Sequence, residues 1–416
     1  MSVSLMFSGD IHLGRSPHRL AASGLIPADY GPEVALIRLV DEAIARRVEA
    51  VVLAGDVVDE PRDRFEAFGV LERAARRLSG AGIALYAVAG NHDGDVLPRL
   101  AARVEGFRLL GAGGIWERVA VPGAGRVSLL GWSFPTRVVR ESPLGLPSLA
   151  AALEGRAEEE AVLGVVHGDL DAAESSYAPL STRALERVPV DGWLLGHVHQ
   201  PGALSVSRPV GYLGSLVGLD RGEPGLRGPW LVEVRGRGRL SARQLALGPV
   251  LWRPLSVDLT GVEPTAEALG EALLDRLVGA RAEAPPRVDL IACSVRLEGS
   301  PLGRAQPGWW EALSPERLLL PGRPAVAVVA VEDHTSTRRP LAELARIGGP
   351  IGVLAGLLER LEGGGPLPEG LDLTLGAARR WPRQVEEAPL PGDRELLLEA
   401  GRRMLDRLLA QLEEVR

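Results

Sequence analysis

Residues 50–59 read AVVLAGDVVD: five apolar residues lead directly into Gly55, Asp56 and Asp59. A short apolar run that ends in glycine and aspartate is typical of a buried strand of a parallel sheet, with the polar residues in the loop that follows. Other strand-like runs of the first 200 residues also end in polar residues, namely Asp10, His12, Asn91, His92, His167, His197 and His199. Because ligand chemistry in such sheets collects beyond the carboxyl ends of the strands, we expect these side chains to lie together.

Amphipathic segments separate these strand-like runs. Apolar residues recur at three- and four-residue spacing within residues 34–48 and 65–78, which predicts helices. Alternating strands and helices indicate a layered α/β domain with a largely parallel sheet.

Composition excludes several kinds of chemistry. All 47 basic residues of the 416 are Arg, so sites that need a lysine ammonium, such as a Walker-A loop or a Schiff base, are absent. The single Cys293 excludes an intrachain disulfide and a cysteine-rich zinc module. A net charge of −7 argues against a protein that coats polyanions, although a focused basic groove stays compatible with it.

The pattern changes near residue 250, and we expect three parts. Residues 1–250 form the α/β domain, residues 251–388 a smaller α+β capping domain, and residues 389–416 a C-terminal helical segment. Within the capping domain we expect strands at 252–259, 288–297 and 325–331, with helices at 265–278 and 309–319.

Two short motifs place possible ligands on one face of the chain. Side chains two residues apart on an extended segment point the same way, so Asp10 and His12, and likewise His197 and His199, can each converge on one site. Imidazole, carboxylate and carboxamide ligands without thiolate suit Mn²⁺ or Fe, and Zn²⁺ is an alternative.

The order of these motifs resembles the calcineurin-like metallophosphoesterase superfamily: Asp-x-His, Gly-Asp-x-x-Asp, Gly-Asn-His-Asp, His and Gly-His-x-His. The resemblance implies a four-layer αββα sandwich that binds two divalent metal ions, most simply Mn²⁺. It assigns one ion to Asp10, His12, Asp56 and His199, and the other to Asp56, Asn91, His167 and His197, with Asp56 bridging.

The same resemblance implies roles for two further residues. Two ions about 4 Å apart lower the pKa of a bridging water, whose hydroxide attacks phosphorus. His92 would then protonate the leaving group, and the Asp59 carboxylate would orient His92. The alternative for Asp59 is a solvated loop carboxylate.

Four segments favour one branch of the superfamily. The opening Asp10–Gly14 and the stretch Pro209–Leu216 resemble SbcD-like DNA repair exonucleases, and residues 251–259 and 331–335 resemble the YhaO-type branch. This implies a Mn²⁺-dependent exonuclease or endonuclease acting on DNA. Two alternatives stay open: a phosphodiesterase on a cyclic nucleotide or dinucleotide, and a non-catalytic subunit of an ATPase assembly with structural metals.

Substrate contacts and partners follow from the same resemblance. Arg15, Arg62, Arg64 and Arg221 lie in loops beside the motifs and are candidates for phosphate contacts, the alternative being solvated surface. An SMC-like coiled-coil ATPase is the expected partner of the C-terminal helix, which otherwise packs on its own chain, and a homodimer is a further expectation. The N-terminus has no basic signal region and no run is long enough to span a membrane, so we expect a cytoplasmic protein.

Overall fold

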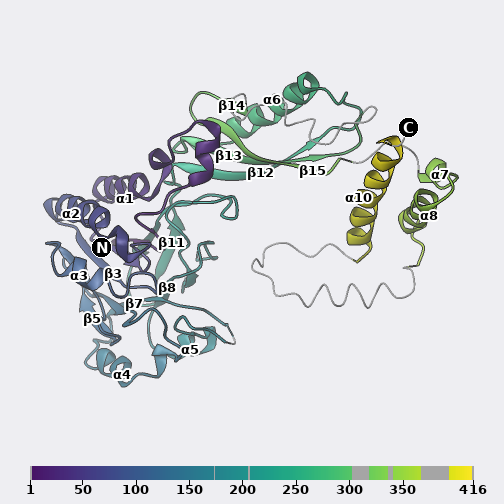
Figure 1. The fold of residues 1–416 in the computed structure, drawn as a ribbon. Helices are drawn as coiled ribbons and strands as arrows, with labels where there is room; N and C mark the ends of the chain where they lie inside the picture. Colours follow the sequence, from purple (N-terminus) through teal and green to yellow (C-terminus); the bar gives the residue numbers. More distant parts are fainter. Residues whose placement is uncertain are drawn as a thin grey trace. The chain divides into compact units, whose positions relative to one another are not determined.

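The computed structural model describes residues 2–172, 174–204, 207–301, 318–335, 341–366 and 393–414 (Figure 1). The chain divides into two compact units. The first comprises Met1–Pro254, Leu277–Ser294 and Pro315–Val329, and the second comprises Leu255–Arg276, Val295–Ser314 and Ala330–Arg416. The expected boundaries at residues 250 and 388 stay a prediction.

A six-stranded sheet forms the first half of the larger unit. Its strand order is β11 (Leu240–Gln244), β10 (Trp230–Val234), β1 (Val3–Ser8), β2 (Ala50–Ala54), β3 (Ala84–Val88) and β4 (Phe107–Leu109). Strands β1 to β4 are mutually parallel, whereas β10 pairs antiparallel with both β1 and β11. The parallel strands are therefore the ones that carry the first three motifs.

A five-stranded sheet forms the second half. Its order is β5 (Glu117–Ala120), β6 (Val127–Trp132), β7 (Ala161–His167), β8 (Gly192–Gly196) and β9 (Val210–Tyr212). Only β5 is antiparallel to its neighbour. The last two motifs follow β7 and β8, so each sheet supplies part of the site.

Alternation along the strands explains how the two sheets stack. Leu5 and Phe7 of β1 pack in one apolar cluster with Leu163 and Val165 of β7, whereas Met6 packs on the opposite face of its sheet. That opposite face is covered by α1 (Pro32–Arg46) and α2 (Arg64–Gly80). The outer face of the second sheet is covered by α4 (Pro147–Leu153) and α5 (Thr182–Arg187). The predicted four-layer αββα arrangement is confirmed.

Shorter elements connect these layers. They are α3 (Leu97–Ala101) and the 3₁₀ turns η1 (His18–Ser23), η2 (Pro27–Tyr30), η3 (Pro61–Asp63) and η4 (Pro143–Gly145). The turn η3 leads directly into α2, so the residues after Asp59 are held close to the loop of the Gly-Asp-x-x-Asp motif.

A third sheet follows the αββα domain. Its order is β12 (Val250–Asp258), β13 (Leu290–Glu298), β15 (Ala325–Asp333) and β14 (Leu319–Leu320), with α6 (Ala266–Ala282) between β12 and β13 in sequence. Most of the helix expected at 309–319 lies outside the described residues. Its end at Leu319 is wrong, because Leu319 pairs with Ala327 as a strand residue.

The C-terminal helix α10 (Asp393–Glu414) lies beside α7 (Leu341–Leu344) and α8 (Pro350–Glu362) within the second unit (Figure 1). Leu405 and Leu409 of α10 share an apolar cluster with Leu344, Ile351 and Leu358. Much of the apolar face of this helix is thus covered by the chain itself. Within the described ranges, no helix combines the length and apolar character needed to cross a bilayer.

Candidate metal centre

Strand ends from both sheets bring the candidate ligands together. Asp10 and His12 follow β1, Asp56 follows β2, Asn91 follows β3, His167 ends β7, and His197 and His199 follow β8. Asp10, His12, Asp56 and His197 all have positive φ angles, between 47° and 110°. Non-glycine residues rarely adopt this conformation, and it gathers at functional sites that the surrounding structure holds rigid.

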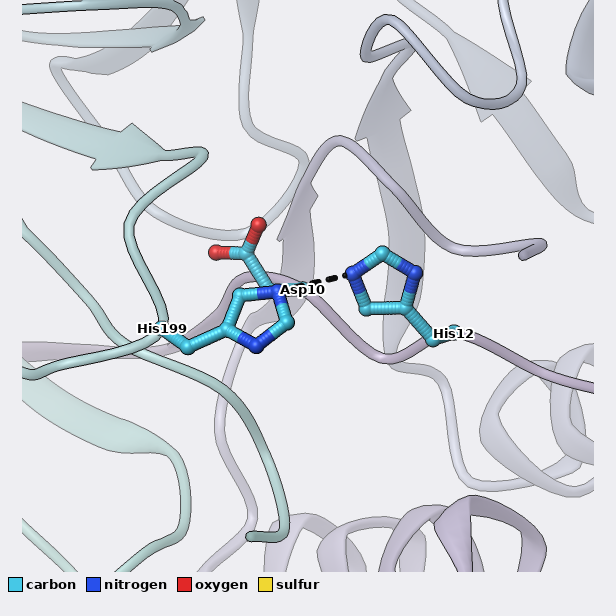
Figure 2. A group of neighbouring side chains, drawn as sticks. All are labelled: Asp10, His12 and His199. Atoms are coloured by element: carbon cyan, nitrogen blue, oxygen red, sulfur yellow. Dashed lines mark hydrogen bonds between the residues drawn. The ribbon is translucent and has the colours of Figure 1, made fainter. Parts of the chain in front are cut away.

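One donor group consists of Asp10, His12 and His199 (Figure 2). Their ligand atoms lie within 4.8 Å of one another, and Nε2 of His12 is 3.0 Å from Nε2 of His199. Both oxygens of Asp10 also accept the main-chain N–H of His197, at 2.9 and 3.1 Å. The carboxylate is therefore fixed in place and is 1% exposed.

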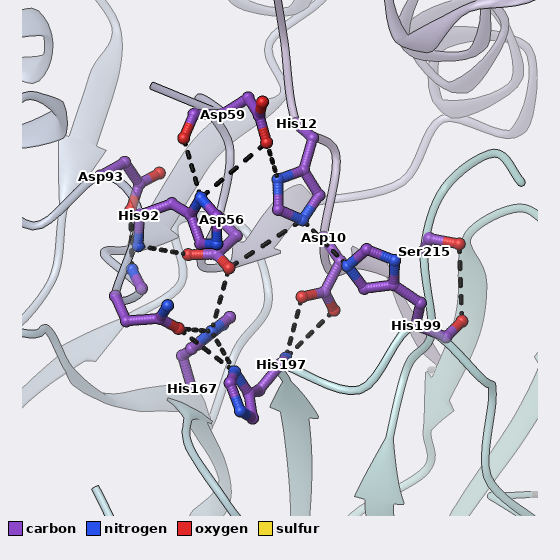
Figure 3. Close-up of polar contacts among 12 residues, drawn as sticks. Asp10, His12, Asp56, Asp59, His92, Asp93, His167, His197, His199 and Ser215 are labelled. Atoms are coloured by element: carbon purple, nitrogen blue, oxygen red, sulfur yellow. Dashed lines mark hydrogen bonds and ion pairs between the residues drawn. The ribbon is translucent and has the colours of Figure 1, made fainter. Parts of the chain in front are cut away.

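A second donor group consists of Asp56, His167 and His197 (Figure 3). Asn91 contacts both of its histidines. Oδ1 of Asn91 is 3.0 Å from Nε2 of His167 and 3.2 Å from Nδ1 of His197. These two nitrogens are 3.2 Å apart. Three candidate ligand atoms thus converge on one small space.

Asp56 lies between the two groups. Its Oδ2 is 3.3 Å from Nε2 of His167 and 3.9 Å from Nε2 of His12. Its Oδ1 accepts the main-chain N–H of His92 at 3.0 Å. One oxygen thus anchors the side chain, and the other is placed to serve both groups (Figure 3).

Each of the four histidines in the two donor groups has one ring nitrogen turned away from the other ligand atoms. This outer nitrogen faces a hydrogen-bond acceptor in all four cases. The pairs are His12 with Asp59 (2.9 Å), His167 with the Ala54 carbonyl (3.1 Å), His197 with Asp169 (3.0 Å) and His199 with Glu223 (2.7 Å). A neutral imidazole that donates through its outer nitrogen has only a lone pair on its inner nitrogen. Lone pairs about 3 Å apart repel unless a cation lies between them. The arrangement therefore fits divalent metal ions at both groups.

The pKa shifts of two buried ligands, His167 and Asp56, also fit a bound cation. Burial lowers the pKa of the fully buried His167, but the neighbouring Asp56 carboxylate outweighs burial and raises that pKa to about 9. Burial raises the pKa of Asp56, yet the His167 and His12 imidazoles hold it well below its ordinary value. The buried site thus favours positive charge beside its carboxylates, and a cation can replace the protons when it binds.

His92 and Asp59 form the third donor group with His12. The Asp59 carboxylate is 2.9 Å from Nδ1 of His12 but 3.8 Å from Nδ1 of His92. His92 Nδ1 instead donates to the main-chain carbonyl of Asp59 at 2.8 Å. The ring of His92, with a side chain 38% exposed, keeps its Nε2 available to a substrate.

Two glycines allow the strands to approach His167. A Cβ at Gly196 would come within 1.9 Å of the Ala54 carbonyl oxygen and 2.7 Å of Nδ1 of His167. A Cβ at Gly55, whose φ is 87°, would lie 2.5 Å from the same nitrogen. The glycines that precede Asp56 and His197 are therefore required by space.

The candidate phosphate-binding arginines are all exposed. Burial raises the pKa of the Asp59 carboxyl, but His12, with smaller effects from Arg15 and His92, holds that pKa below its usual range. Arg62 pairs with Glu60, and Arg64 bonds the Pro61 carbonyl and lies over the Phe65 ring. Arg221 lies in the loop between β9 and β10.

Two residues at the site were not predicted from the sequence. Asp169 contacts His197, and Glu223 contacts His199. Asp169 stands two residues after His167, a spacing that offered a weak signal. Glu223 lies in a loop whose sequence carries no metal-ligand pattern.

Comparisons with known proteins agree with this geometry. Residues 3–201 match the model of the calcineurin-like phosphoesterase family. The uncharacterized metallophosphoesterase YhaO of Bacillus subtilis is 29% identical over 229 residues, which cover 53% of this chain and 54% of YhaO. The chain thus spans about half the length of this relative.

Two solved structures also match. One is TT1561 of Thermus thermophilus, with 15% identity, a TM-score of 0.35, and coverage of 59% of this chain and 99% of that one. The other is a dimetal phosphatase from Danio rerio, with 14% identity, a TM-score of 0.37, and coverage of 59% and 98%. Residues 3–201 of this chain are thus similar to the calcineurin-like phosphoesterase family, and both converging donor groups lie within these residues.

Proposed function

We propose that the protein is a two-metal phosphodiesterase that acts on DNA. The position of Asp56 supports a centre with two metal ions, because one of its carboxylate oxygens faces both donor groups. When bound, two divalent ions would activate a water molecule and neutralise charge on the phosphoryl oxygens. Asp10, His12, Asp56 and His199 would hold one ion, and Asp56, Asn91, His167 and His197 the other.

His92 is the proposed proton donor. Hydrolysis adds water across a P–O bond, and the departing oxygen needs a proton. The Asp59 carbonyl accepts the Nδ1 proton of His92, which leaves Nε2 to carry the transferable proton. The partly exposed ring lies edge-on to His12, with centroids 5.1 Å apart, so it stands beside the donor groups without belonging to either ligand set.

DNA as the substrate rests on the resemblance of residues 10–14 and 209–216 to SbcD-like nucleases. Exposed guanidinium groups support it, since Arg15 and Arg221 lie in loops that follow the motifs. Arg62 and Arg64, which were expected in loops, lie in the 3₁₀ turn η3 and at the start of α2. The second candidate is a small cyclic nucleotide or dinucleotide, which the net charge of −7 favours over an extended polyanion.

One experiment tests both parts. Metal-stripped protein is reloaded with Mn²⁺ and offered linear duplex, hairpin and single-stranded DNA beside an aryl phosphodiester and cyclic nucleotides. We expect DNA cleavage that His92→Ala lowers by at least about 100-fold while bound metal is unchanged. The matched control is His18→Ala, because His18 is exposed and lies outside the site.

The outcomes separate the candidates. Cleavage of the small esters alone would reject DNA as the substrate and favour the second candidate. Metal-loaded protein that hydrolyses no phosphodiester would reject the enzymatic function and favour an assembly subunit with structural metals. Joint loss of metal and activity in His92→Ala would reject its role as proton donor.

We also propose an SMC-like coiled-coil ATPase as partner, with the surface of α8 and α10 as the docking region. Leu405 and Leu409 face α8, whereas Met404 of α10 and Val353 of α8 are 58% and 75% exposed. Co-purification with a candidate ATPase, lost in Met404→Glu plus Val353→Glu, tests this. Size-exclusion chromatography with light scattering tests the expected homodimer.

A further inference from the structure

Two carboxylates outside the family motifs bind the histidines of the Gly-His-x-His segment. Oδ1 of Asp169 is 3.0 Å from Nε2 of His197, and Oε1 of Glu223 is 2.7 Å from Nδ1 of His199. Both carboxylates are largely buried, with side chains 24% and 14% exposed. Because His197 belongs to one donor group and His199 to the other, each carboxylate acts on a different metal position.

The two histidines turn opposite ring nitrogens inward. His199 gives Nδ1 to Glu223 and directs Nε2 at His12, whereas His197 gives Nε2 to Asp169 and directs Nδ1 at Asn91. Their places on the chain, two residues apart, do not dictate this difference. The acceptor on the outer side determines which nitrogen keeps its proton, and so which one presents a lone pair.

Glu223 is itself held in place. Its Oε2 accepts bonds from the Ser215 hydroxyl at 3.2 Å and from the Leu219 main-chain N–H at 3.1 Å. Ser215 is completely buried, and its main-chain N–H donates to the carbonyl of His199 at 2.9 Å. The same serine therefore ties down both the histidine and the carboxylate that orients it.

Asp169 is held by the same part of the chain. The Tyr212 hydroxyl accepts the main-chain N–H of Leu170 at 2.6 Å and donates to the Gly168 carbonyl at 3.1 Å, which fixes the residues on either side of Asp169. Ser175 donates to the second oxygen of Asp169. Residues 212–215 thus support both carboxylates.

We propose that Asp169 and Glu223 are positioning residues that select the metal-facing nitrogens of His197 and His199, and that residues 212–215 hold both carboxylates for this task. This inference rests on the two-metal function proposed above. It extends that function by dividing the supporting carboxylates between the two metal positions, one to each.

Variants that lack a ligand of one metal position allow the effect of each carboxylate to be measured on the other position alone. His167→Ala removes a ligand of one position and His12→Ala a ligand of the other, and each protein is stripped of metal and titrated with Mn²⁺. Glu223→Ala should weaken the site that remains in His167→Ala by about 10- to 100-fold, the usual cost of losing such a partner. Asp169→Ala should do the same in His12→Ala. When Glu223→Ala is combined with His12→Ala, or Asp169→Ala with His167→Ala, the Mn²⁺ affinity of the remaining site should change by less than about threefold.

Isosteric variants and neighbours serve as controls. Glu223→Gln and Asp169→Asn keep the shape of the side chain and should give smaller losses in the same backgrounds. Glu174→Gln alters an exposed carboxylate, and Asp220→Asn alters a half-buried one that pairs with Arg19. Both lie in the same two loops and should leave Mn²⁺ affinity unchanged. The thermal midpoint of each metal-free variant is measured as well, which shows whether an alanine variant is unfolded. If one is, the Mn²⁺ affinities of Glu223→Gln and Asp169→Asn test the proposal instead.

A failure of the proposed function can be distinguished from a failure of this inference. Wild-type protein that binds no Mn²⁺ would reject the proposed function itself. Wild-type protein that binds two ions, with both carboxylate variants unchanged in affinity, would reject this inference alone. Lower metal-free stability with unchanged affinity would also overturn it, because the carboxylates would then serve only the fold.

Discussion

Asp59 offers different groups to two histidines. Its carboxylate contacts Nδ1 of His12 at 2.9 Å, and its main-chain carbonyl accepts Nδ1 of His92 at 2.8 Å. A side-chain substitution removes the first contact and keeps the second. The two histidines therefore respond differently to changes at this residue.

Replacing Asp59 should affect metal binding before it affects His92. We expect Asp59→Ala to lower Mn²⁺ affinity by about tenfold or more, because His12 loses the acceptor that orients its ring. Titration of metal-stripped protein measures this, with His92→Ala as the matched variant that leaves affinity unchanged. If Asp59→Ala leaves Mn²⁺ affinity unaltered and loses as much turnover as His92→Ala, Asp59 acts by orienting the proton donor His92 and not by orienting His12.

Cys293 provides a probe of an interior strand. It is fully buried in β13, and burial raises its pKa to about 12. At pH 8 roughly one molecule in 10⁴ would carry the reactive thiolate. We expect no labelling by a thiol reagent in native protein within minutes and complete labelling in denaturant. Rapid native labelling would contradict this burial.

At the scale of elements, Glu42 joins helix α1 to the chain that enters β13. It is 5% exposed, bonds Arg46 one turn later at 2.5 Å, and also pairs with Arg287. Burial raises the pKa of Glu42, but the two guanidinium groups outweigh burial and leave that pKa below its ordinary value. A carboxyl with a lowered pKa stabilises the fold above its unfolded-state pKa, and the stabilisation is lost as the pH falls through the folded-state pKa.

Glu42→Gln should therefore destabilise the protein in a pH-dependent way. At pH 7 we expect a loss of about 1–3 kcal/mol in the free energy of unfolding, because two charged hydrogen bonds are removed. The difference from wild type should shrink as the pH falls below the ordinary pKa of glutamate and through the lowered pKa of Glu42. Urea unfolding across this range measures it. Glu33→Gln on the same helix, which breaks an exposed pair with Arg73, is the control and should cost less than about 1 kcal/mol. A loss that is the same at every pH would contradict the ion-pair explanation.

The elements show which features the sequence could reveal. Asp56 and Asn91 were predictable neighbours because parallel strands end at one edge of a sheet, and the apolar runs of β2 and β3 are plain. Leu319 was wrongly expected in a helix, since β14 is a short edge strand defined by its pairing with β15. Glu223 could not be foreseen, because its contact with His199 depends on how the chain between these two residues, which includes β9, folds back. Local periodicity carries no information about such contacts.

At the scale of the whole molecule, the candidate metal centre joins two sheets. His12 and Asp56 belong to loops of the six-stranded sheet, whereas His167, His197 and His199 belong to the five-stranded sheet. The ligands of each proposed ion come from both sheets, so an ion bound there would connect the two sheets. Bound ions would therefore stabilise the entire αββα domain rather than one loop.

Metal removal should accordingly lower the thermal midpoint of the αββα domain. With free Mn²⁺ at about 100 times its dissociation constant, one site adds roughly 2.7 kcal/mol, and a domain of this size gains about 2–4 °C per kcal/mol. We expect chelation to lower the midpoint by at least about 5 °C and Mn²⁺ to restore it, as followed by differential scanning calorimetry. Asp56→Asn is the control: it removes the carboxylate that faces both groups, so Mn²⁺ should raise its midpoint far less. Because the substitution also removes the buried partner of His167, its metal-free form should be less stable than metal-free wild type, so the comparison concerns the rise in midpoint that Mn²⁺ produces in each protein. An equal response to Mn²⁺ in both proteins would contradict a metal centre built around Asp56.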